Sequence, residues 1–409
     1  MKCRHCGAPL AHSFLDLGSA PPSNAYLSSD GLRGPETWFP LRLLVCDQCW
    51  LVQTEDHAGR EALFTQEYGY FSSVSTSWVA HAQRYVADMV TRLSLNTQSL
   101  VVEVAANDGY LLQHVAAQGI PCLGIEPTAS TAAAARAKGL AIKEAFFGTE
   151  LATQLVDQGK QTDLTVANNV LAHVPDINDF VAGFARLLKP QGVATFEFPH
   201  LMRMVQFNQF DTAYHEHYSY LSLGAVERVF QHNGLQVFDV QELPTHGGSL
   251  RVFAQRADSG SRTPLPAVQH LLDQEQAAGL NTLAYYQGFQ AQAETVKNNL
   301  LAFLLKARQE GKKVGAYGAA AKGNTLLNFA GVRPDLLPYV VDNSPGKQGR
   351  FMPGSRIPIV SHQHLMDDRP DYIVLLPWNL KQELSDALAS RRDWGGQVVV
   401  AVPALEVSP

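Results

Sequence analysis

The sequence contains 409 residues, of which 46% are hydrophobic and 17% are charged, and its formal net charge is −6. This composition is that of folded domains and argues against a disordered chain, and the length predicts two or three domains. The acidic balance, with no long basic stripe, argues against nucleic acid or an anionic membrane surface as a partner. No apolar run approaches the roughly 20 residues that span a bilayer, and the first residues, MKCRHCGAPL, contain no apolar signal core. We therefore expect a cytoplasmic protein that is a monomer or a weak homo-oligomer.

Two CxxC pairs define the first predicted unit, a zinc-binding module over residues 1–58. Cys3 and Cys6 form one pair, and Cys46 and Cys49 form the other. Four thiolates suit one tetrahedral Zn²⁺ with no open position for substrate, so its predicted role is folding and docking. Two unrelated thiol pairs or a thioredoxin-like redox centre are the alternatives. The redox centre expects a CxxC pair that opens a helix after a strand, which a pair at residue 3 does not fit.

The second predicted domain, residues 59–262, begins with a helical pattern that covers residues 57–95. An apolar strand, Leu100 to Val104, then meets a loop of small residues that ends at Gly109. A helix and a second strand, Cys122–Ile125, follow, and Glu126 stands at the end of that strand. Further strands are expected at 164–167 and 193–198. This alternation of strands and helices predicts a parallel sheet covered on both faces.

The segment from Glu103 to Gly109, EVAANDG, lies where a nucleotide binds in such a sheet, at the C-terminal end of a strand. Small residues such as Ala105 and Asn107 let a ligand approach the backbone, and Glu126 suits the two ribose hydroxyls. NAD(P) favours GxGxxG because its diphosphate packs on glycine-lined backbone, but only Gly109 is present, and the acidic side chains would repel a diphosphate. S-adenosylmethionine carries a sulfonium and an ammonium group, so the acids favour it as the cofactor. A purely structural turn is the remaining alternative.

The segment after the third strand, NNVLAHVPD, is expected at the same edge of the sheet. Asn168 is a candidate contact for the methionine part of the cofactor or for the substrate, and His173 is a candidate contact for the substrate. A helix cap or a packing role fits His173 equally well. Tyr68 and Tyr70, which precede the helices of this domain, are candidates for a lid over cofactor and substrate, and packing is an equally good interpretation for each of them.

The third predicted unit, residues 263–409, begins with a long helical stretch over 264–310, with a break expected at Gly279 or Gly288. A second α/β pattern follows, with strands expected at 337–341, 372–376 and 397–402. Its first strand-to-helix turn, residues 315–323, contains three glycines and Lys322. Backbone amides at a helix N-terminus together with a lysine bind phosphate well, although such turns are often purely structural. The predicted fold class is therefore α/β, with the small zinc-binding module followed by two Rossmann-like, doubly wound domains.

Six blocks of sequence, taken in chain order, indicate a family: CxxC…CxxC, EVAANDGYLL, NNVLAHVPD, YHEHYSYLS, THGGSLRVF and GAYGAAAKGNTLLN. The chain resembles the S-adenosylmethionine-dependent sugar C-methyltransferases, which make branched 3-C-methyl deoxysugars on a dTDP carrier. The resemblance runs nearly end to end. It implies a class I methyltransferase domain between the zinc module and a C-terminal nucleotide-binding-like domain, with the nucleotide-sugar bound between the last two. Ala105 stands where the family usually has glycine, which would shift the local turn.

The same resemblance assigns proton abstraction to the tract YHEHY, residues 214–218. Removal of the hydrogen alpha to the carbonyl of a 4-keto sugar, at C3, gives an enolate that accepts a methyl group, and the protein must supply a base and a partner for the oxyanion. His217 is the first candidate for the base, and Tyr214 is the alternative base or an acid near the 4-oxo group. Glu216 could position the sugar or orient a histidine, and His215 could do either or face away. A metal site and an ordinary polar turn are the competing interpretations, but HEH lacks the i, i+4 spacing of HExxH helices.

Candidate contacts for the sugar diphosphate are Arg251, Lys322 and Lys347. Two other functions fit parts of the pattern. One is an NAD(P)-linked oxidoreductase that acts on a nucleotide-sugar, and the other is a non-catalytic nucleotide-sugar-binding protein with a zinc docking module.

Overall fold

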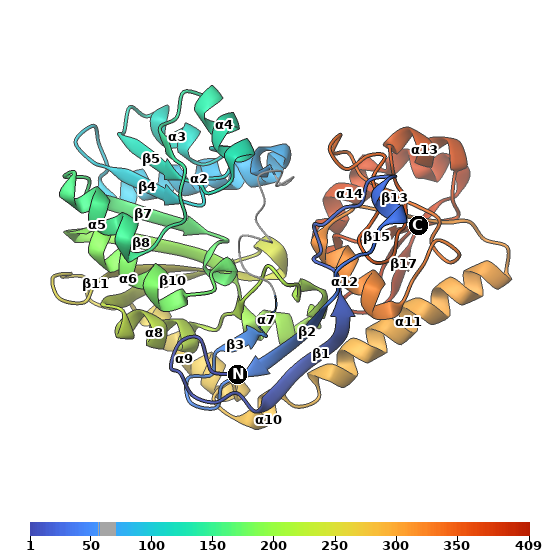
Figure 1. Cartoon of the computed structure of the whole chain (residues 1–409), viewed down its shortest axis with the longest axis horizontal. Helices are drawn as coiled ribbons and strands as arrows, with labels where there is room; N and C mark the ends of the chain where they lie inside the picture. Colours follow the sequence, from blue (N-terminus) through green and yellow to red (C-terminus); the bar gives the residue numbers. More distant parts are fainter. Residues whose placement is uncertain (56, 58–70) are drawn as a thin grey trace.

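The computed structural model describes residues 1–55, 57 and 71–409, so Tyr68 and Tyr70 lie outside the described residues. Two α/β lobes stand side by side, and a small β-sheet near the N-terminus lies below the junction between them (Figure 1). Within the described residues, no helix is long and apolar enough to cross a membrane.

The small sheet combines the N-terminal module with one strand of the first lobe. Its strand order is β1-β2-β3-β9, and all its pairings are antiparallel. The strands are β1 (His12–Ala20), β2 (Phe39–Val45), β3 (Val52–Thr54) and β9 (Ser219–Tyr220). Because β9 comes directly after the tract YHEHY, this pairing fixes the tract against the N-terminal module.

The sheet of the first lobe has seven strands in the order β10-β11-β8-β7-β4-β5-β6. Its strands are β4 (Val101–Val104), β5 (Cys122–Ile125), β6 (Ile142–Lys143), β7 (Thr162–Asn168), β8 (Leu188–Pro199), β10 (Leu235–Leu243) and β11 (Ser249–Arg256). β4 to β8 are parallel, whereas β11 is antiparallel to both of its neighbours. The strand order reverses between β4 and β7, and the crevice at such a reversal is where ligands bind in open α/β sheets.

Helices cover both faces of this sheet, and its central strands are therefore buried on both sides. On one face Phe184, Phe196 and Phe230 pack ring against ring, with centroids 4.6 and 4.7 Å apart. On the other face α2 packs Tyr85, Val86 and Met89 into a second cluster. The helices are α2 (Thr76–Leu93), α3 (Leu112–Ala116), α4 (Ala129–Ala137), α5 (Thr149–Asp157), α6 (Ile177–Leu187), α7 (Leu201–Gln206) and α8 (Leu223–His232).

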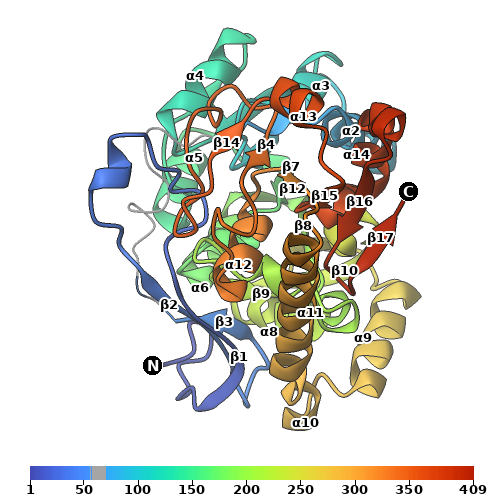
Figure 2. The same cartoon turned by 90° about the vertical axis from the view of Figure 1, so that its right-hand side faces the viewer.

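The connection between the lobes consists of α9 (Pro266–Ala278), α10 (Leu283–Tyr286) and α11 (Phe289–Gln309). Gly279 and Gly288 have φ values of 93° and 90°, which glycine adopts without strain, so the predicted long helix is broken at both glycines. α11 contacts α12 and β1, and Figure 2 shows it along the outside of the second lobe.

The sheet of the second lobe has the order β14-β13-β12-β15-β16-β17, and only β17 is antiparallel. Its strands are β12 (Val314–Tyr317), β13 (Val340–Val341), β14 (Ile359–Val360), β15 (Tyr372–Leu375), β16 (Gln397–Val400) and β17 (Glu406–Ser408), and its helices are α12 (Ala321–Ala330), α13 (His362–Asp368) and α14 (Lys381–Ala387). The strand order reverses between β12 and β15. The predicted fold class, with two doubly wound α/β units, is confirmed.

Candidate active site

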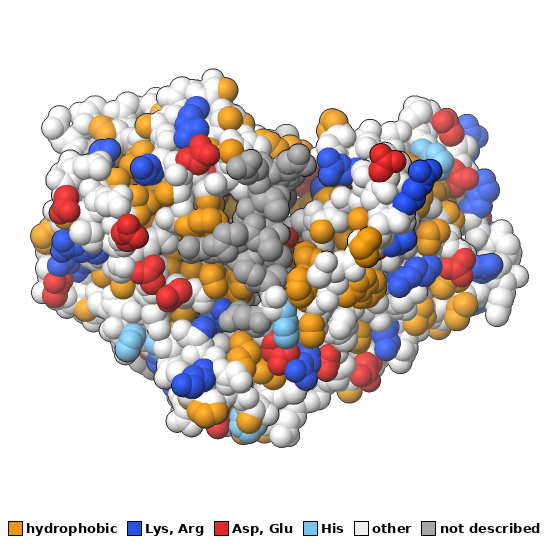
Figure 3. Space-filling model, viewed as in Figure 1, with side chains coloured by type: hydrophobic (Ala, Val, Ile, Leu, Met, Phe, Trp, Pro, Cys, Tyr) orange, Lys and Arg blue, Asp and Glu red, His pale blue; other side chains and the backbone are white. Residues whose placement is uncertain are grey.

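A cavity of about 400 Å³ lies between the lobes, and Figure 3 shows the hollow that separates them on one face. Its walls come from both reversal points: the loops after β4, β5 and β7 on one side, and the loops after β12 and β15 on the other. Residues of the segment 212–217 line it as well, and the N-terminal module contributes Asn24. Three parts of the chain that are distant in sequence therefore meet at one cavity.

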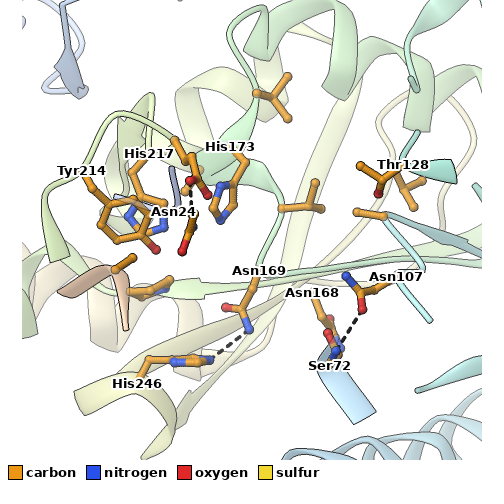
Figure 4. Close-up of a pocket in the computed structure, with 18 of the residues that line it drawn as sticks. Asn24, Ser72, Asn107, Thr128, Asn168, Asn169, His173, Tyr214, His217 and His246 are labelled. Atoms are coloured by element: carbon orange, nitrogen blue, oxygen red, sulfur yellow. Dashed lines mark hydrogen bonds between the residues drawn. The ribbon is translucent and has the colours of Figure 1, made fainter. Parts of the chain in front are cut away.

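The loop after β4 forms one end of the cavity. Ala105 and Asn107 line it, and both adopt positive φ, 58° and 48°. Glu126 holds the loop in place, because one carboxylate oxygen accepts from the Asn107 amide at 2.9 Å and the other from the Thr128 amide at 3.0 Å. The Asn107 side chain in turn accepts from the Ser72 amide at 2.9 Å, as Figure 4 shows.

Glu103, which lies in β4, and Gly109, in the loop after β4, are not among the described residues that line the cavity. Burial raises the pKa of Glu103 well above its ordinary value, and the nearby charges of Glu126 and Asp108 raise it further. Gly109 has φ 77°, and a Cβ there would lie 2.2 Å from the side chain of Leu140. The structure thus places Glu103 behind the loop and gives Gly109 a close packing contact.

Asn168 gives an independent indication that this end takes a polar ligand. It lines the cavity at the end of β7, and both polar atoms of its side chain are buried without a hydrogen-bond partner among the described residues. A buried amide in that state is costly, and the amino and carboxylate groups of S-adenosylmethionine would satisfy it. Ala105, Asn107, Glu126 and Asn168 therefore fit this cofactor.

His217 lines the cavity opposite the loop after β4 and has a defined tautomer. Its Nδ1 is 2.9 Å from the carbonyl oxygen of Thr212. Because a carbonyl only accepts, Nδ1 carries the hydrogen, and the lone pair of the neutral ring is on Nε2. Burial lowers the pKa of His217 well below its ordinary value, and repulsion by His173 adds to this effect. The ring is therefore neutral at physiological pH.

The neighbours of His217 hold its ring from two sides. The rings of Tyr214 and His217 are 3.9 Å apart, and His173 meets His217 edge to face at 4.6 Å. Burial lowers the pKa of His173 to about 4, and its side chain is hydrogen-bonded to the main chain of Glu216. The Glu216 carboxylate accepts from the Asn24 side chain at 2.7 Å. Figure 4 shows Tyr214, His217, His173 and Asn24 gathered opposite Asn107 and Thr128.

His215 faces away from the cavity. Its Nε2 lies 3.3 Å from the carbonyl oxygen of Phe39 and 3.2 Å from that of Pro40, and it does not line the cavity. The tract makes a tight turn, in which the His217 amide donates to the Tyr214 carbonyl at 2.9 Å. Tyr214, Glu216 and His217 line the cavity, while His215 meets the N-terminal module.

All three units fix the conformation of this tract. From the N-terminal module, the Thr54 hydroxyl donates to the His217 carbonyl. In the first lobe, the Tyr218 amide donates to the Ala172 carbonyl at 2.8 Å. From the second lobe, the Thr325 hydroxyl on α12 donates to the Ala213 carbonyl at 2.8 Å. The geometry of the tract therefore depends on the docking of the units on one another.

The second lobe contributes positive charge to the cavity. Lys322 is at the start of α12, with its ammonium 4.6 Å from the centre of the Trp378 ring and 3.4 Å from the Asn379 side-chain oxygen. Burial lowers the pKa of Lys322, and the charge of Asp211 opposes that shift. Lys347 also lines the cavity and donates to the Ala319 carbonyl at 2.9 Å. Backbone at a helix N-terminus and two ammonium groups suit an anionic ligand.

Arg251, the third candidate for a diphosphate contact, does not line the cavity. Its side chain is buried, and its Nε donates to the Glu197 carboxylate at 2.7 Å. His81 lies 2.9 Å from the same carboxylate. Although burial raises the pKa of Glu197, its hydrogen bond with His81 and the charge of Arg251 lower it below its ordinary value.

Several lining residues were not predicted as site residues. Asn169 and His246 both line the cavity, and the Asn169 amide nitrogen is 3.2 Å from Nε2 of His246. Both have φ 55°, an unusual backbone conformation that marks constrained sites. The histidine beside two glycines in THGGSLRVF was the available signal for His246. Asn24 had no such signal.

The four cysteines of the CxxC pairs converge as predicted. Their sulfur atoms all lie within 4.8 Å of one another. Each pair closes a similar turn: the Gly7 amide donates to the Cys3 carbonyl at 3.0 Å, and the Trp50 amide to the Cys46 carbonyl at 2.9 Å. Gly7 and Trp50 have positive φ, 76° and 62°. Four thiolates in this arrangement suit a tetrahedral zinc ion.

Known proteins resemble the chain along nearly its whole length. Family models match as a zinc binding domain over residues 3–64, a methyltransferase domain over 78–240 and a C-methyltransferase C-terminal domain over 244–403. The C-methyltransferase NovU of Streptomyces niveus is 33% identical over 402 residues, which are 98% of this chain and 95% of that protein. The ubiquinone biosynthesis O-methyltransferase of Bartonella quintana is 27% identical over 94 residues, 23% of this chain and 38% of that protein.

Among solved structures, the magnesium protoporphyrin IX methyltransferase of Synechocystis with bound S-adenosylhomocysteine aligns at 15% identity with a TM-score of 0.35, over 44% of this chain and 83% of that one. A methyltransferase of Clostridium acetobutylicum aligns at 11% identity with a TM-score of 0.36, over 45% of this chain and 92% of that one.

The family models and NovU confirm the predicted enzyme class, a methyltransferase, together with its zinc-binding module. The predicted cofactor, S-adenosylmethionine, is the one that the methyltransferase domain and the residues around Asn168 support. The chain belongs to the C-methyltransferase family.

Proposed function

We propose that this enzyme methylates a carbon next to a ketone in a nucleotide-linked deoxysugar, with C3 of a dTDP-4-keto sugar as the acceptor. The observation that carries this proposal is the neutral His217, whose lone pair is on Nε2, in a cavity with two chemically different ends. The curated relative that spans almost the whole chain is itself a C-methyltransferase.

The two ends of the cavity suit the two ligands. Glu126, Asn107 and Asn168 offer a carboxylate and amides to the ribose and the amino acid part of the methyl donor. Lys322 and Lys347 offer ammonium groups to the diphosphate of the nucleotide. A sugar attached to that diphosphate would extend from the second lobe toward His217.

S-adenosylmethionine would supply an electrophilic methyl group when bound. The work of the protein is to make a nucleophilic carbon beside it. His217 accepts the C3 proton at Nε2, and the electron pair of the C–H bond passes into the enolate with its negative charge on the 4-oxygen. Tyr214, whose ring centre lies 3.9 Å from that of His217, would donate to that oxygen. The new imidazolium is then stabilised by the enolate next to it, which offsets the burial that keeps free His217 neutral.

The proposal is tested with purified enzyme, S-adenosylmethionine carrying a ¹³C methyl group, and a dTDP-4-keto-deoxysugar. We expect a product one methyl group heavier, with the label on C3 by carbon NMR. In D₂O with S-adenosylhomocysteine in place of the donor, we expect exchange of the C3 hydrogen by the wild type. Methyl transfer to a heteroatom, or a label on another carbon, would overturn the assignment of C3.

A calorimetric titration decides between the donor classes independently of the acceptor. We expect S-adenosylhomocysteine to bind stoichiometrically and NADH and NADPH not to bind. Binding of a nicotinamide cofactor alone would contradict the assignment of the loop after β4 and return the oxidoreductase to consideration.

A further inference from the structure

The segment 21–27 of the N-terminal module reaches the active-site cavity. It leaves β1 at Ala20 and is attached to the second lobe at two points. Leu27 and Phe351 exchange backbone hydrogen bonds of 3.0 and 2.9 Å. The Tyr26 hydroxyl donates to the Ala319 carbonyl at 2.6 Å, in the turn that precedes Lys322. Asn24 also bonds within this segment, because its backbone carbonyl accepts from the Tyr26 amide at 2.9 Å and its side-chain oxygen accepts from the Tyr26 hydroxyl at 3.4 Å.

Asn24 points from this segment into the cavity. It lines the cavity, and its amide nitrogen donates to the Glu216 carboxylate at 2.7 Å. A hydrogen bond to a carboxylate is stronger than one between neutral groups and fixes its orientation. Figure 4 shows Asn24 beside His173 and His217, with the dashed line of this bond.

The position of Glu216 affects two neighbouring residues of the cavity, His173 and His217. Its main chain is bonded to the His173 side chain, and His217 is the next residue. The carboxylate is buried, at 2% exposure, so its direction is set by the groups that contact it. A small error in the position of a group that contacts substrate has a large effect on rate.

We propose that Asn24 is a positioning residue of the active site, which orients the Glu216 carboxylate toward the acceptor. The zinc-binding module would then contribute to catalysis as well as to folding. This inference rests on the proposed function, and it takes the first of the two roles expected for Glu216 from the sequence, positioning the sugar.

Asn24→Asp is the sharpest test, because it keeps the shape of the side chain and replaces the donor by a second carboxylate. At neutral pH the two carboxylates repel each other, whereas at lower pH one shared proton restores both the hydrogen bond and the original net charge. We expect kcat to fall about 10-fold to 100-fold at neutral pH and to recover as the pH falls. The wild type has a neutral amide at position 24 and only one carboxylate here, so it should not show this recovery.

Two further variants complete the experiment. Asn24→Ala removes the donor without adding a charge, so we expect a lower kcat with no recovery at low pH, and it carries the test if Asn24→Asp fails to fold. Ser29→Ala changes an exposed residue a few positions away and should behave as the wild type. In each variant, zinc content and the affinity for S-adenosylhomocysteine should be unchanged.

The inference is overturned if kcat of both Asn24 variants stays within about 2-fold of the wild type, or if Asn24→Asp loses activity equally at every pH. Failure of the proposed function is a separate result, because it is read from the wild type alone. A wild type without methyl transfer to the 4-keto sugar removes the assigned acceptor, whereas the ratio of variant to wild-type rates reports on Asn24.

Discussion

The two lobes are built on the same plan but present opposite chemistry to the cavity. In each lobe the strand order reverses beside the cavity, between β4 and β7 in the first and between β12 and β15 in the second. The first lobe presents Glu126 and the amides of Asn107 and Asn168, whereas the second presents Lys322 and Lys347. The fold therefore decides where a ligand binds, and a few residues after the strands decide which ligand.

The tract YHEHY belongs to neither end. It lies between them and is held by hydrogen bonds from the N-terminal module and from α12. If the lobes divide the binding of the two ligands, a change in this tract should affect turnover and leave both affinities intact.

The largest expected effect follows from His217→Ala. Loss of a general base lowers kcat by about 10²-fold to 10⁴-fold, while the dissociation constant of S-adenosylhomocysteine should remain nearly unchanged. The same variant should also lose exchange of the C3 hydrogen in D₂O. His270→Ala, at an exposed position on α9, is the matched control. Unchanged turnover in His217→Ala would remove this residue from the mechanism and leave Tyr214 as the candidate base.

Lys322→Met tests the anionic-ligand end. We expect the KM for the nucleotide-sugar to rise about 10-fold to 100-fold, because a hydrogen bond to a charged group is lost, with no change in the affinity for S-adenosylhomocysteine. The variant should fold, because position 322 is only half-buried and methionine has a similar length. Lys306→Met on α11, with 73% of its side chain exposed, is the control. An equal loss of affinity for both ligands would contradict the division between the lobes.

The reciprocal change is Glu126→Gln. The amide oxygen can still accept from the Asn107 or Thr128 backbone, so the loop should keep its shape while the charge is lost. We expect the dissociation constant of S-adenosylhomocysteine to rise about 10-fold and the KM for the nucleotide-sugar to stay constant, by calorimetry and initial rates. Glu150→Gln, at an exposed position in the first turn of α5, should change neither value.

Chain order explains which parts of this site could be predicted. The cysteine spacing was sufficient for the metal-ligand set, and Ala105, Asn107, Glu126 and Asn168 follow strands whose C-terminal ends share one edge of a parallel sheet. Contacts between distant segments could not be predicted in this way. Asn24 and Glu216 are 192 positions apart, and β9 joins a sheet of the N-terminal module.

The role of Arg251 also depends on a contact between distant segments that could not be predicted. Its position after a glycine-rich turn suggested a diphosphate contact, but the antiparallel pairing of β11 with β8 places it directly opposite Glu197. Opposite charges at facing positions of two strands attract each other, so the guanidinium pairs with the Glu197 carboxylate within the sheet. Only the register of β11, which was not predicted, reveals this pairing.

The pH dependence of stability should reflect the buried histidines around the cavity. His173, His217 and His246 come from the first lobe, and burial lowers the pKa of each, to about 4 for His173 and His246. The unfolded chain therefore binds more protons between pH 6.5 and 4, so stability is greatest above pH 6.5 and falls as the pH drops through this range. Asp211, whose pKa burial raises to about 6, and Glu103, whose pKa burial also raises, act in the opposite sense, but the three histidines outnumber them.

Calorimetric melting between pH 7.5 and 5 checks this expectation. We expect the melting temperature to fall with pH, and to fall less steeply in His246→Asn. A melting temperature that rises as the pH drops would show that the carboxyls of Asp211 and Glu103 dominate.

The smallest expected effect concerns Ala105, where the first lobe departs from the glycine usual in the family. Its φ of 58° places an alanine in the left-handed region, which costs a residue with a Cβ about 1 kcal/mol relative to glycine. Ala105→Gly should therefore raise the free energy of unfolding by up to about 1 kcal/mol, less the extra entropy of glycine in the unfolded chain, and change cofactor affinity little. Ala137→Gly, at an exposed position in α4, should lower the free energy of unfolding by about 1 kcal/mol. Because the two substitutions are chemically identical, opposite signs in denaturant unfolding would show that the backbone conformation of the cofactor loop, and not the loss of a methyl group, sets the effect. Equal losses in both variants would show that the loop at Ala105 carries no strain.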